Sequence, residues 1–339
     1  MSSRRLANQP LLLPLVCAAG AAVFVILHYG DDGGFARLLA PSGLGLLGIL
    51  GAVLLRWGTA TLKFHVLLRR WGTWFSARDS FQLQLTGICG AAVTPAASGA
   101  SPAYLWYLWR RGVPGPRAMA VAAYTTALDA ILFAATVPAV LPAYVRMVGG
   151  EMPLGVVLTA LLLSFGAMVF GSLLVFAPRL AVRWIGMLLG PLPRLRRRAL
   201  PPLLRAAAAI GELRRARPSF HLGMLLLTAL EWLGIYAVLP TAAWTLGLEV
   251  SWAALLVVQH VVQVVAFVFP TPGGSGLFEA GLPVAAGVAW PAEAAASLIL
   301  LWRFWSYGIY LVIAAWFGSA FLARALQERE RAASVEEKN

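Results

Sequence analysis

Apolar residues follow one another in runs long enough to cross a lipid bilayer. A helix needs about 20 residues to cross a hydrocarbon core of about 30 Å, because each residue adds about 1.5 Å. The runs predict six full spans, at roughly 10–28, 42–62, 118–141, 154–177, 220–240 and 294–322. The expected fold is therefore an all-α polytopic membrane protein, with a single transmembrane domain over 1–339.

Two further apolar stretches, 81–109 and 253–290, are interrupted near the middle by proline, glycine and serine. Neither half of either stretch is comfortably a full span. A broken backbone leaves N–H and C=O groups unpaired, so it is tolerated at membrane depth only where it is packed in protein or lines a polar cavity. We therefore expect two re-entrant helical hairpins, each with a non-helical tip inside the membrane.

The two tips have similar sequences. The first tip, TPAASG at 94–99, and the second tip, TPGGSG at 271–276, share the pattern T-P-x-x-S-G, and a glutamine precedes each threonine by twelve residues. Each tip lies in a unit of span, hairpin and span, over 42–141 and 220–322. The first unit begins outside and the second inside, which predicts an inverted repeat with a site between the broken helices. The alternative is that proline and glycine only shape a tight helix crossing.

Composition and charge agree with a membrane protein. The 339 residues are 60% hydrophobic and 12% charged, whereas soluble domains carry about 25% charged residues. The net charge of +13 does not indicate nucleic-acid binding, because the arginines and lysines fall between the apolar runs and no nucleic-acid motif accompanies them. By the positive-inside rule, nearly all of these cations lie in the cytoplasm, together with both chain termini. The cytoplasmic segments are 1–9, 63–80, 110–117, 178–219 and 323–339.

Two of these cytoplasmic segments are long enough to have a structure of their own. The basic segment 178–219 is either an amphipathic segment on the membrane surface or a plain topogenic loop. The charged tail 323–339 is interpreted as a frayed helix end.

Five ionisable residues lie in or beside apolar segments: Arg56, Asp129, Glu231, Glu279 and Arg303. Such groups cost about 2.5–3.5 kcal/mol on insertion scales, so each is a functional candidate. Relative to the tips, Arg56 matches Glu231 and Asp129 matches Arg303, so equivalent depths carry opposite charges. This permits the intramembrane pairs Arg56–Glu231 and Asp129–Arg303, although the sequence does not fix the partners. The alternative to a functional role is that the pairs only hold the bundle together.

The last two of these residues have more specific candidate roles. For Arg303 we favour a phosphate ligand, since its planar fork binds phosphate through two hydrogen bonds. Glu279 either caps the helix behind the second tip or carries a proton. His260, between glutamines in the second hairpin, either faces a polar cavity or is a satisfied core residue.

Motifs of common enzymes are missing from the sequence. No HExxH, GxSxG or P-loop occurs. We therefore expect no enzymatic activity, no cofactor and no metal site.

Three motifs resemble a known family: TPAASGASPAYLWYLWRRGVP at 94–114, PTPGGSGLFEAG at 270–281 and LLWRFWSYG at 300–308. Over roughly 40–322 the chain resembles the flippase-like family that includes the transmembrane region of lysylphosphatidylglycerol synthases. The resemblance implies lipid translocation or a related membrane-lipid role. Ala100 and Ser101 stand where many relatives have glycine and a polar residue, which puts the headgroup selectivity in doubt. We expect no aminoacyl-transferring domain after residue 322, which argues against lipid aminoacylation.

The leading hypothesis is a flippase in the bacterial inner membrane. It would move an anionic phospholipid or a polyprenyl-phosphate-linked lipid between leaflets by alternating access. The alternatives are an integral membrane lipid-modifying transferase, and a non-transporting scaffold for a lipid-synthesis enzyme as partner. The sequence does not identify the lipid, the direction of transport, a coupling ion or the oligomeric state. The expected substrate-binding residues are Thr94, Pro95, Ser98, Gly99, Thr271, Pro272, Gly273, Gly274, Ser275, Gly276, Glu279, Arg303 and Tyr307.

Overall fold

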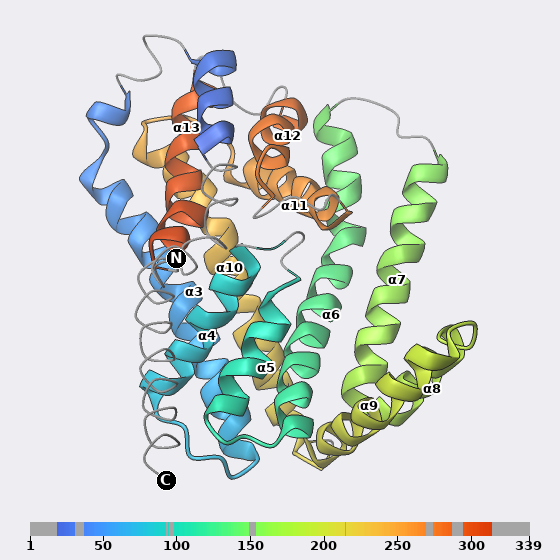
Figure 1. Cartoon of the computed structure of the whole chain (residues 1–339). Helices are drawn as coiled ribbons and strands as arrows, with labels where there is room; N and C mark the ends of the chain where they lie inside the picture. The colour runs from blue at the N-terminus through green and yellow to red at the C-terminus, as the bar shows by residue number, and fades with distance from the viewer. Residues whose placement is uncertain are drawn as a thin grey trace, which may run out of the picture.

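The fold is a bundle of α-helices joined by turns (Figure 1). The computed structural model describes residues 19–30, 37–92, 94, 98–148, 154–213, 215–268, 274–286 and 294–313. Four helices in this part of the chain are long and apolar enough to cross a bilayer. They are α3 (Gly43–Arg70), α6 (Gly115–Val148), α10 (Pro218–Thr245) and a helix over Ala295–Ile313 that contains α13 (Ala295–Arg303) and the π-helical turn η2 (Phe304–Gly308). The described part of the chain is helical throughout, and its four long apolar helices agree with the expected all-α membrane protein.

The four long helices correspond to four of the six expected spans. A fifth expected span coincides with α7 (Leu154–Phe176). The first, 10–28, is described only from residue 19, at the start of a helix over Ala19–Tyr29. The helix α3 continues to Arg70, eight residues past its expected end at 62, because the following residues keep forming backbone bonds outside the apolar run. The total number of spans stays a prediction.

The helices α3 and α10 pack side by side and run antiparallel (Figure 1). Gly45 near the start of α3 lies against Thr245 at the end of α10. A Cβ at Gly234 of α10 would lie 2.7 Å from the backbone nitrogen of Arg56 and 2.8 Å from the carbonyl oxygen of Ala52. Small residues allow such close backbone contact between membrane helices. These two helices open the two proposed units, and an antiparallel relation is what an inverted repeat requires. The repeat itself stays a prediction.

Both interrupted stretches form pairs of short helices. The first pair is α4 (Ala77–Ala92) and α5 (Ala100–Arg110), and the second is α11 (Trp252–Val268) and α12 (Leu277–Ala286). At about 1.5 Å per residue, none of them reaches the hydrocarbon thickness of about 30 Å. The hairpins therefore exist as expected, while their entry into a bilayer from one side stays a prediction.

A capping box begins α4. The Ser76 hydroxyl accepts a hydrogen bond from the Asp79 N–H at 3.1 Å, and the Asp79 carboxylate accepts one from the Ser76 N–H at 3.2 Å. Arg111, just after α5, lies 2.8 Å from the same carboxylate. Partial burial would raise the pKa of Asp79, but the Ser76 hydrogen bonds and the Arg111 charge hold this pKa below its ordinary value. The box and the ion pair join the two ends of the first hairpin.

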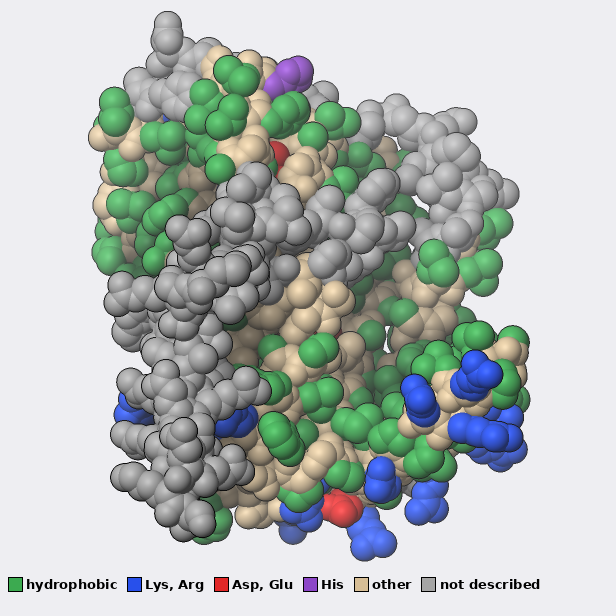
Figure 2. All heavy atoms as spheres, in the orientation of Figure 1, with side chains coloured by type: hydrophobic (Ala, Val, Ile, Leu, Met, Phe, Trp, Pro, Cys, Tyr) green, Lys and Arg blue, Asp and Glu red, His purple; other side chains and the backbone are tan. Residues whose placement is uncertain are grey.

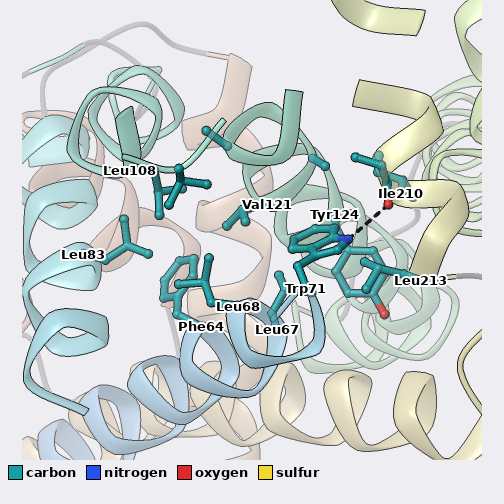
Figure 3. Close-up of a cluster of buried hydrophobic side chains, with 14 of the residues drawn as sticks. Phe64, Leu67, Leu68, Trp71, Leu83, Leu108, Val121, Tyr124, Ile210 and Leu213 are labelled. Carbon is teal, nitrogen blue, oxygen red and sulfur yellow. Dashed lines mark hydrogen bonds between the residues drawn. The ribbon is translucent and has the colours of Figure 1, made fainter. Parts of the chain in front are cut away.

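The basic segment 178–219 consists of two helices, α8 (Pro178–Leu188) and α9 (Pro193–Leu213). It is therefore not a plain loop. Five residues in the second half of α9 are buried: Ala206, Ala207, Ala209, Ile210 and Leu213. The Trp71 indole donates to the carbonyl oxygen of Ala209 at 3.2 Å. Figure 3 shows this contact at the edge of an apolar cluster to which α3, α4, α5, α6, α7, α9 and α10 contribute. Its labelled members are Phe64, Leu67, Leu68, Trp71, Leu83, Leu108, Val121, Tyr124, Ile210 and Leu213.

The basic segments gather at one end of the bundle. The α3–α4 and α5–α6 connections lie at the lower end in Figure 1, and α8 and α9 lie at the lower right. Figure 2 shows most of the visible arginines and lysines in this lower part, including a group over α8 and α9. A single basic end is what the positive-inside rule requires of a multi-pass protein. We call it the basic end.

Candidate functional site

A cavity of about 850 Å³ lies between the two hairpins and the long helices. Ser98 of the first tip and Gly274 of the second both line it, and both hairpins, α3, α6, α7, α10 and the helix over Ala295–Ile313 supply the rest of the wall. The volume is within the range of about 300–1,000 Å³ that small-molecule sites occupy. Most lining residues are apolar, and Arg56, Asp129, Glu231 and Arg303 are the ionisable ones besides tyrosines.

Arg303 and Glu279 form a buried ion pair that fixes the second tip. The Arg303 Nε donates to one carboxylate oxygen of Glu279 at 2.6 Å, and the other oxygen accepts from the Gly276 N–H at 2.8 Å. Gly276 immediately precedes α12, so Glu279 caps this helix as the capping alternative predicts. An Arg303 Nη also donates to the Ser275 hydroxyl at 3.3 Å. The side chains of Arg303 and Glu279 are only 12% and 5% exposed, so the pair joins α12 to α13 inside the protein.

The pairs Arg56–Glu231 and Asp129–Arg303 are not the ones that form. Glu231 pairs with Lys63 at 2.5 Å, and Asp129 lies 3.7 Å from the same ammonium group. Lys63 had been placed in a cytoplasmic segment because α3 was expected to end at 62. The helix continues, and two turns separate Lys63 from Arg56, which returns its side chain to the same face. The signal in the sequence was a single lysine followed by the mostly apolar residues FHVLL.

Arg56 contacts aromatic residues instead of a carboxylate. Its Nη1 donates to the Tyr310 hydroxyl at 2.5 Å, and its guanidinium carbon lies 4.4 Å from the centre of the Tyr310 ring. The Trp57 indole donates to the same hydroxyl at 3.2 Å. Within the described part of the chain, no acidic side chain lies within ion-pair distance of Arg56. Its charge therefore faces the cavity with a neutral partner.

Hydrogen bonds within the protein account for several other predicted site residues. The Thr94 hydroxyl donates to the Gly90 carbonyl oxygen and accepts from the Gly99 N–H, both at 2.7 Å, so Thr94 closes the first tip. The Tyr307 hydroxyl donates to the Ala92 carbonyl oxygen at 3.0 Å, which joins η2 to the end of α4. Pro95, Thr271, Pro272 and Gly273 lie outside the described residues.

His260 is a satisfied core residue. It is 4% exposed, hydrogen-bonds with the hydroxyls of Thr136 and Tyr236 at 3.3 and 3.0 Å, and stacks on Phe133. Among the described residues, no group of three or more His, Cys, Asp or Glu could hold a metal ion.

Three residues that the sequence had not assigned to the site line the cavity and have a buried, unpaired polar atom. They are Gln259 of α11, Trp302 of α13 and Ser306 of η2. The Gln259 Oε1, Trp302 Nε1 and Ser306 Oγ have no hydrogen-bond partner in the described part of the chain. The signal for Gln259 was its spacing of four residues from Gln263, which places two amides on one face of an apolar helix. No comparable sequence pattern indicates the π-helical turn at 304–308, which contains Ser306.

The comparison with protein families agrees with this geometry. The family model of the lysylphosphatidylglycerol synthase TM region matches residues 11–314. The chain belongs to this family. The match extends the resemblance to the N-terminal side of residue 40 and includes both hairpins and the cavity. No curated protein matches the chain. As a member of the lysylphosphatidylglycerol synthase TM family, the protein is a multi-pass membrane protein related to lipid handling.

Proposed function

We propose that this protein is a lipid flippase, which moves an anionic phospholipid or a polyprenyl-phosphate-linked lipid between the leaflets by alternating access. The main support for the proposal is the cavity. Residues of both tips and an arginine without a carboxylate partner among the described residues line one space inside an apolar bundle. A cavity where two broken helices meet is typical of transporter substrate sites. Membership in the lysylphosphatidylglycerol synthase TM family supports a lipid as the substrate.

Arg56 is the proposed phosphate ligand. Arg303 was the candidate from the sequence, but its Nε is already bound to Glu279. Releasing Arg303 would leave a buried carboxylate without its partner, which is costly in a medium of low dielectric constant. Arg56 donates to the neutral hydroxyl of Tyr310 and not to a carboxylate, so an incoming phosphate would form a charge-assisted bond with Arg56 without breaking an ion pair. In this proposal Arg303 holds the second tip in shape.

The bundle offers a simple route for alternating access. The proposed movement is a rocking of one unit against the other about the α3–α10 contact, where glycines let the two backbones touch. The Glu279–Arg303 pair makes the second tip and α13 move as one body. The acyl or prenyl tails stay in the lipid while the headgroup crosses through the cavity.

The proposed location is a bacterial inner membrane, with the basic end and both termini in the cytoplasm. In this orientation α8 and α9 lie at the cytoplasmic surface. Their exposed residues include Leu180, Trp184, Met187 and Leu188 beside several arginines. That combination suits the boundary between anionic headgroups and acyl chains.

Leaflet exchange in proteoliposomes tests the proposal. Fluorescent phosphatidylglycerol in the inner leaflet is protected from an impermeant quencher until it is exchanged. We expect the wild-type protein to accelerate its exposure over protein-free liposomes. Arg56→Lys should retain part of the rate, because an ammonium group supplies charge without the planar fork. Arg56→Gln should lose about tenfold or more, since a charged hydrogen bond contributes about 1.5–3 kcal/mol.

The matched control is Arg70→Gln, at the exposed end of the same helix. It removes the same charge from α3 outside the cavity and should leave the rate unchanged. Thermal unfolding of each variant separates lost transport from lost folding. Exchange of anionic lipid no faster than in protein-free liposomes would refute the flippase. A wild-type rate in Arg56→Gln would remove Arg56 from the site.

A further inference from the structure

Lys63, Asp129 and Glu231 form a charged cluster with one carboxylate in excess. The Lys63 ammonium group lies 2.5 Å from a carboxylate oxygen of Glu231 and 3.7 Å from one of Asp129. The first distance is that of a hydrogen bond and the second is not. The Trp232 indole instead donates to the Asp129 carboxylate at 3.2 Å. Lys63 therefore neutralises Glu231, and Asp129 keeps a charge of its own.

Asp129 is also the most accessible member of this cluster. Its side chain is 39% exposed, whereas the side chains of Glu231 and Lys63 are 20% and 3% exposed. Asp129 lines the cavity and Lys63 does not. Asp129 is therefore the carboxylate of the cluster that a proton in the cavity would reach most easily.

The helices packed against α6 bring several other ionisable groups near Asp129 or into the same cavity wall. They are Lys63 and Arg56 of α3, Tyr104 of α5, Glu231 and Tyr236 of α10, and His260 of α11. The helix α7 has no ionisable residue, and the pair of α9 with α6, between Glu212 and Arg117, lies near the start of α6. His260 is buried, and both of its ring nitrogens have hydroxyl partners. None of these groups forms a closer ion pair with Asp129 than Lys63 does.

The charges of the cavity wall link Asp129 to Arg56. Of the four charged residues that line the cavity, Glu231 and Arg303 belong to close ion pairs. The other two, Arg56 and Asp129, have opposite charges and do not pair with each other. A headgroup with one negative charge would neutralise Arg56 and leave Asp129 as the uncompensated charge. Such a charge is costly in a protein interior, and a proton on Asp129 removes it.

We propose that Asp129 takes up one proton with each anionic headgroup, so that the protein is a proton–lipid symporter. This inference rests on the proposed function, because it adds a coupling ion to the transport of the same headgroup. The Asp129 carboxylate binds the proton as an O–H group when the cavity faces one side of the membrane and releases it on the other, and no other bond changes. A singly charged lipid and its proton together cross without net charge.

A proton suits the cluster better than a sodium ion does. Transporters bind sodium partly through carbonyl groups of unwound backbone. Asp129 and Glu231 lie inside α6 and α10, where backbone carbonyl groups are used in helical hydrogen bonds. The Lys63 ammonium group already lies between the two carboxylates, where a metal ion would need to bind.

Glu279 was the proton carrier considered from the sequence. Its two carboxylate oxygens are already bound, one to the Arg303 Nε and the other to the Gly276 N–H. A proton on Glu279 would therefore break a buried ion pair, whereas a proton on Asp129 leaves the Lys63–Glu231 pair intact.

A pH gradient across proteoliposomes tests the inference. The liposomes are phosphatidylcholine with a trace of fluorescent phosphatidylglycerol, and an impermeant quencher reports its leaflet ratio. Valinomycin with equal potassium on both sides holds the membrane potential at zero. With the interior more alkaline by about one pH unit, the wild-type protein should concentrate the probe in the inner leaflet by up to about tenfold, because one unit is tenfold in proton activity. Protein-free liposomes should show no such shift.

Substitutions of Asp129 locate the proton. Asp129→Asn can still accept from Trp232 but does not take up a proton. It should still exchange labelled for unlabelled phosphatidylglycerol, while the pH gradient no longer shifts the leaflet ratio. Asp129→Glu keeps a titratable group and should keep the shift. The matched control is Glu212→Gln, which neutralises a more exposed carboxylate outside the cavity wall and should respond as the wild type does. A full shift in a folded Asp129→Asn protein would overturn the assignment.

The wild-type protein alone decides whether a proton is coupled, even if Asp129→Asn does not fold. Lipid exchange with no response to the pH gradient leaves the flippase and overturns the symport. A shift produced by a sodium gradient, or by a membrane potential without a pH gradient, also overturns it, because another ion or a net charge would then cross. No lipid exchange at all refutes the proposed function, and the symport with it.

Discussion

Replacing Gly234 by alanine should weaken the contact between α3 and α10. The added Cβ would lie 2.7 Å from the Arg56 nitrogen, 2.8 Å from the Ala52 carbonyl oxygen and 3.0 Å from the Arg56 Cα. Ordinary contacts of a Cβ begin at 3.4 Å, so one backbone must move by about 0.7 Å. Because both neighbours are backbone atoms of a helix, no rotamer change relieves the overlap. We expect a loss of about 1–3 kcal/mol of stability, the usual cost of overpacking a tight interior.

Gly223→Ala is the matched control for this experiment. It makes the same change in the same helix, but its Cβ would meet nothing within 4 Å. Alanine is a better helix former than glycine, so this variant should be as stable as the wild type or more so. The assay is the midpoint of thermal unfolding in detergent, together with the lipid-exchange rate. If Gly234→Ala unfolds at the wild-type temperature and transports normally, α3 and α10 are not held at the described distance.

Three other expectations concern charges. Lys63→Met should destabilise the protein by about 3–5 kcal/mol, because it leaves Glu231 with an uncompensated charge. Adding Glu231→Gln to this variant should recover part of the lost melting temperature. Asp79→Asn should lower stability at neutral pH. Because the pKa of Asp79 is lower in the folded protein than in the unfolded chain, the carboxylate stabilises the fold above the unfolded pKa, and this stabilisation is lost as the pH falls through the folded pKa. The melting temperatures of the variant and the wild type should therefore converge in acid. In a cysteine-free background, Arg146→Cys should react with an impermeant thiol reagent from outside and Arg205→Cys only after permeabilisation; the reverse result would invert the proposed orientation.

The sequence predicted the elements of the fold better than their contacts. Hydropathy located the long helices, because a bilayer demands about 20 apolar residues whatever their neighbours are. The interruptions at 94–99 and 271–276 located the hairpins, because proline and glycine break helices locally. Helix ends were less certain. The end of α3 was placed before Lys63, because hydropathy marks the apolar run and not the helix that continues past it.

The site could be predicted only in part. Arg56, Asp129, Glu231 and Arg303 were identified because a charge in an apolar run is conspicuous by itself, and all four line the cavity. Their partners depend on how helices distant in sequence rotate against each other, which no local pattern specifies. Gln259, Trp302 and Ser306 were not assigned to the site because neutral residues are common in membrane helices. Their burial without a hydrogen-bond partner depends on tertiary contacts, which only the folded chain shows.

The ion pair between Lys63 and Glu231 has a consequence for how the protein is made. The two residues are 168 positions apart, so at about 5–20 residues per second the ribosome delivers Glu231 roughly 8–34 s after Lys63. Asp129, which lies 3.7 Å from Lys63 in the finished protein, is synthesised 66 positions after the lysine, within about 3–13 s at the same rate. Asp129 is thus available as a counterion during insertion, before the final partner is made. Chains interrupted between α7 and α10 would keep that provisional pair, and a nascent chain could wait in the membrane without exposing a lone ammonium group to lipid.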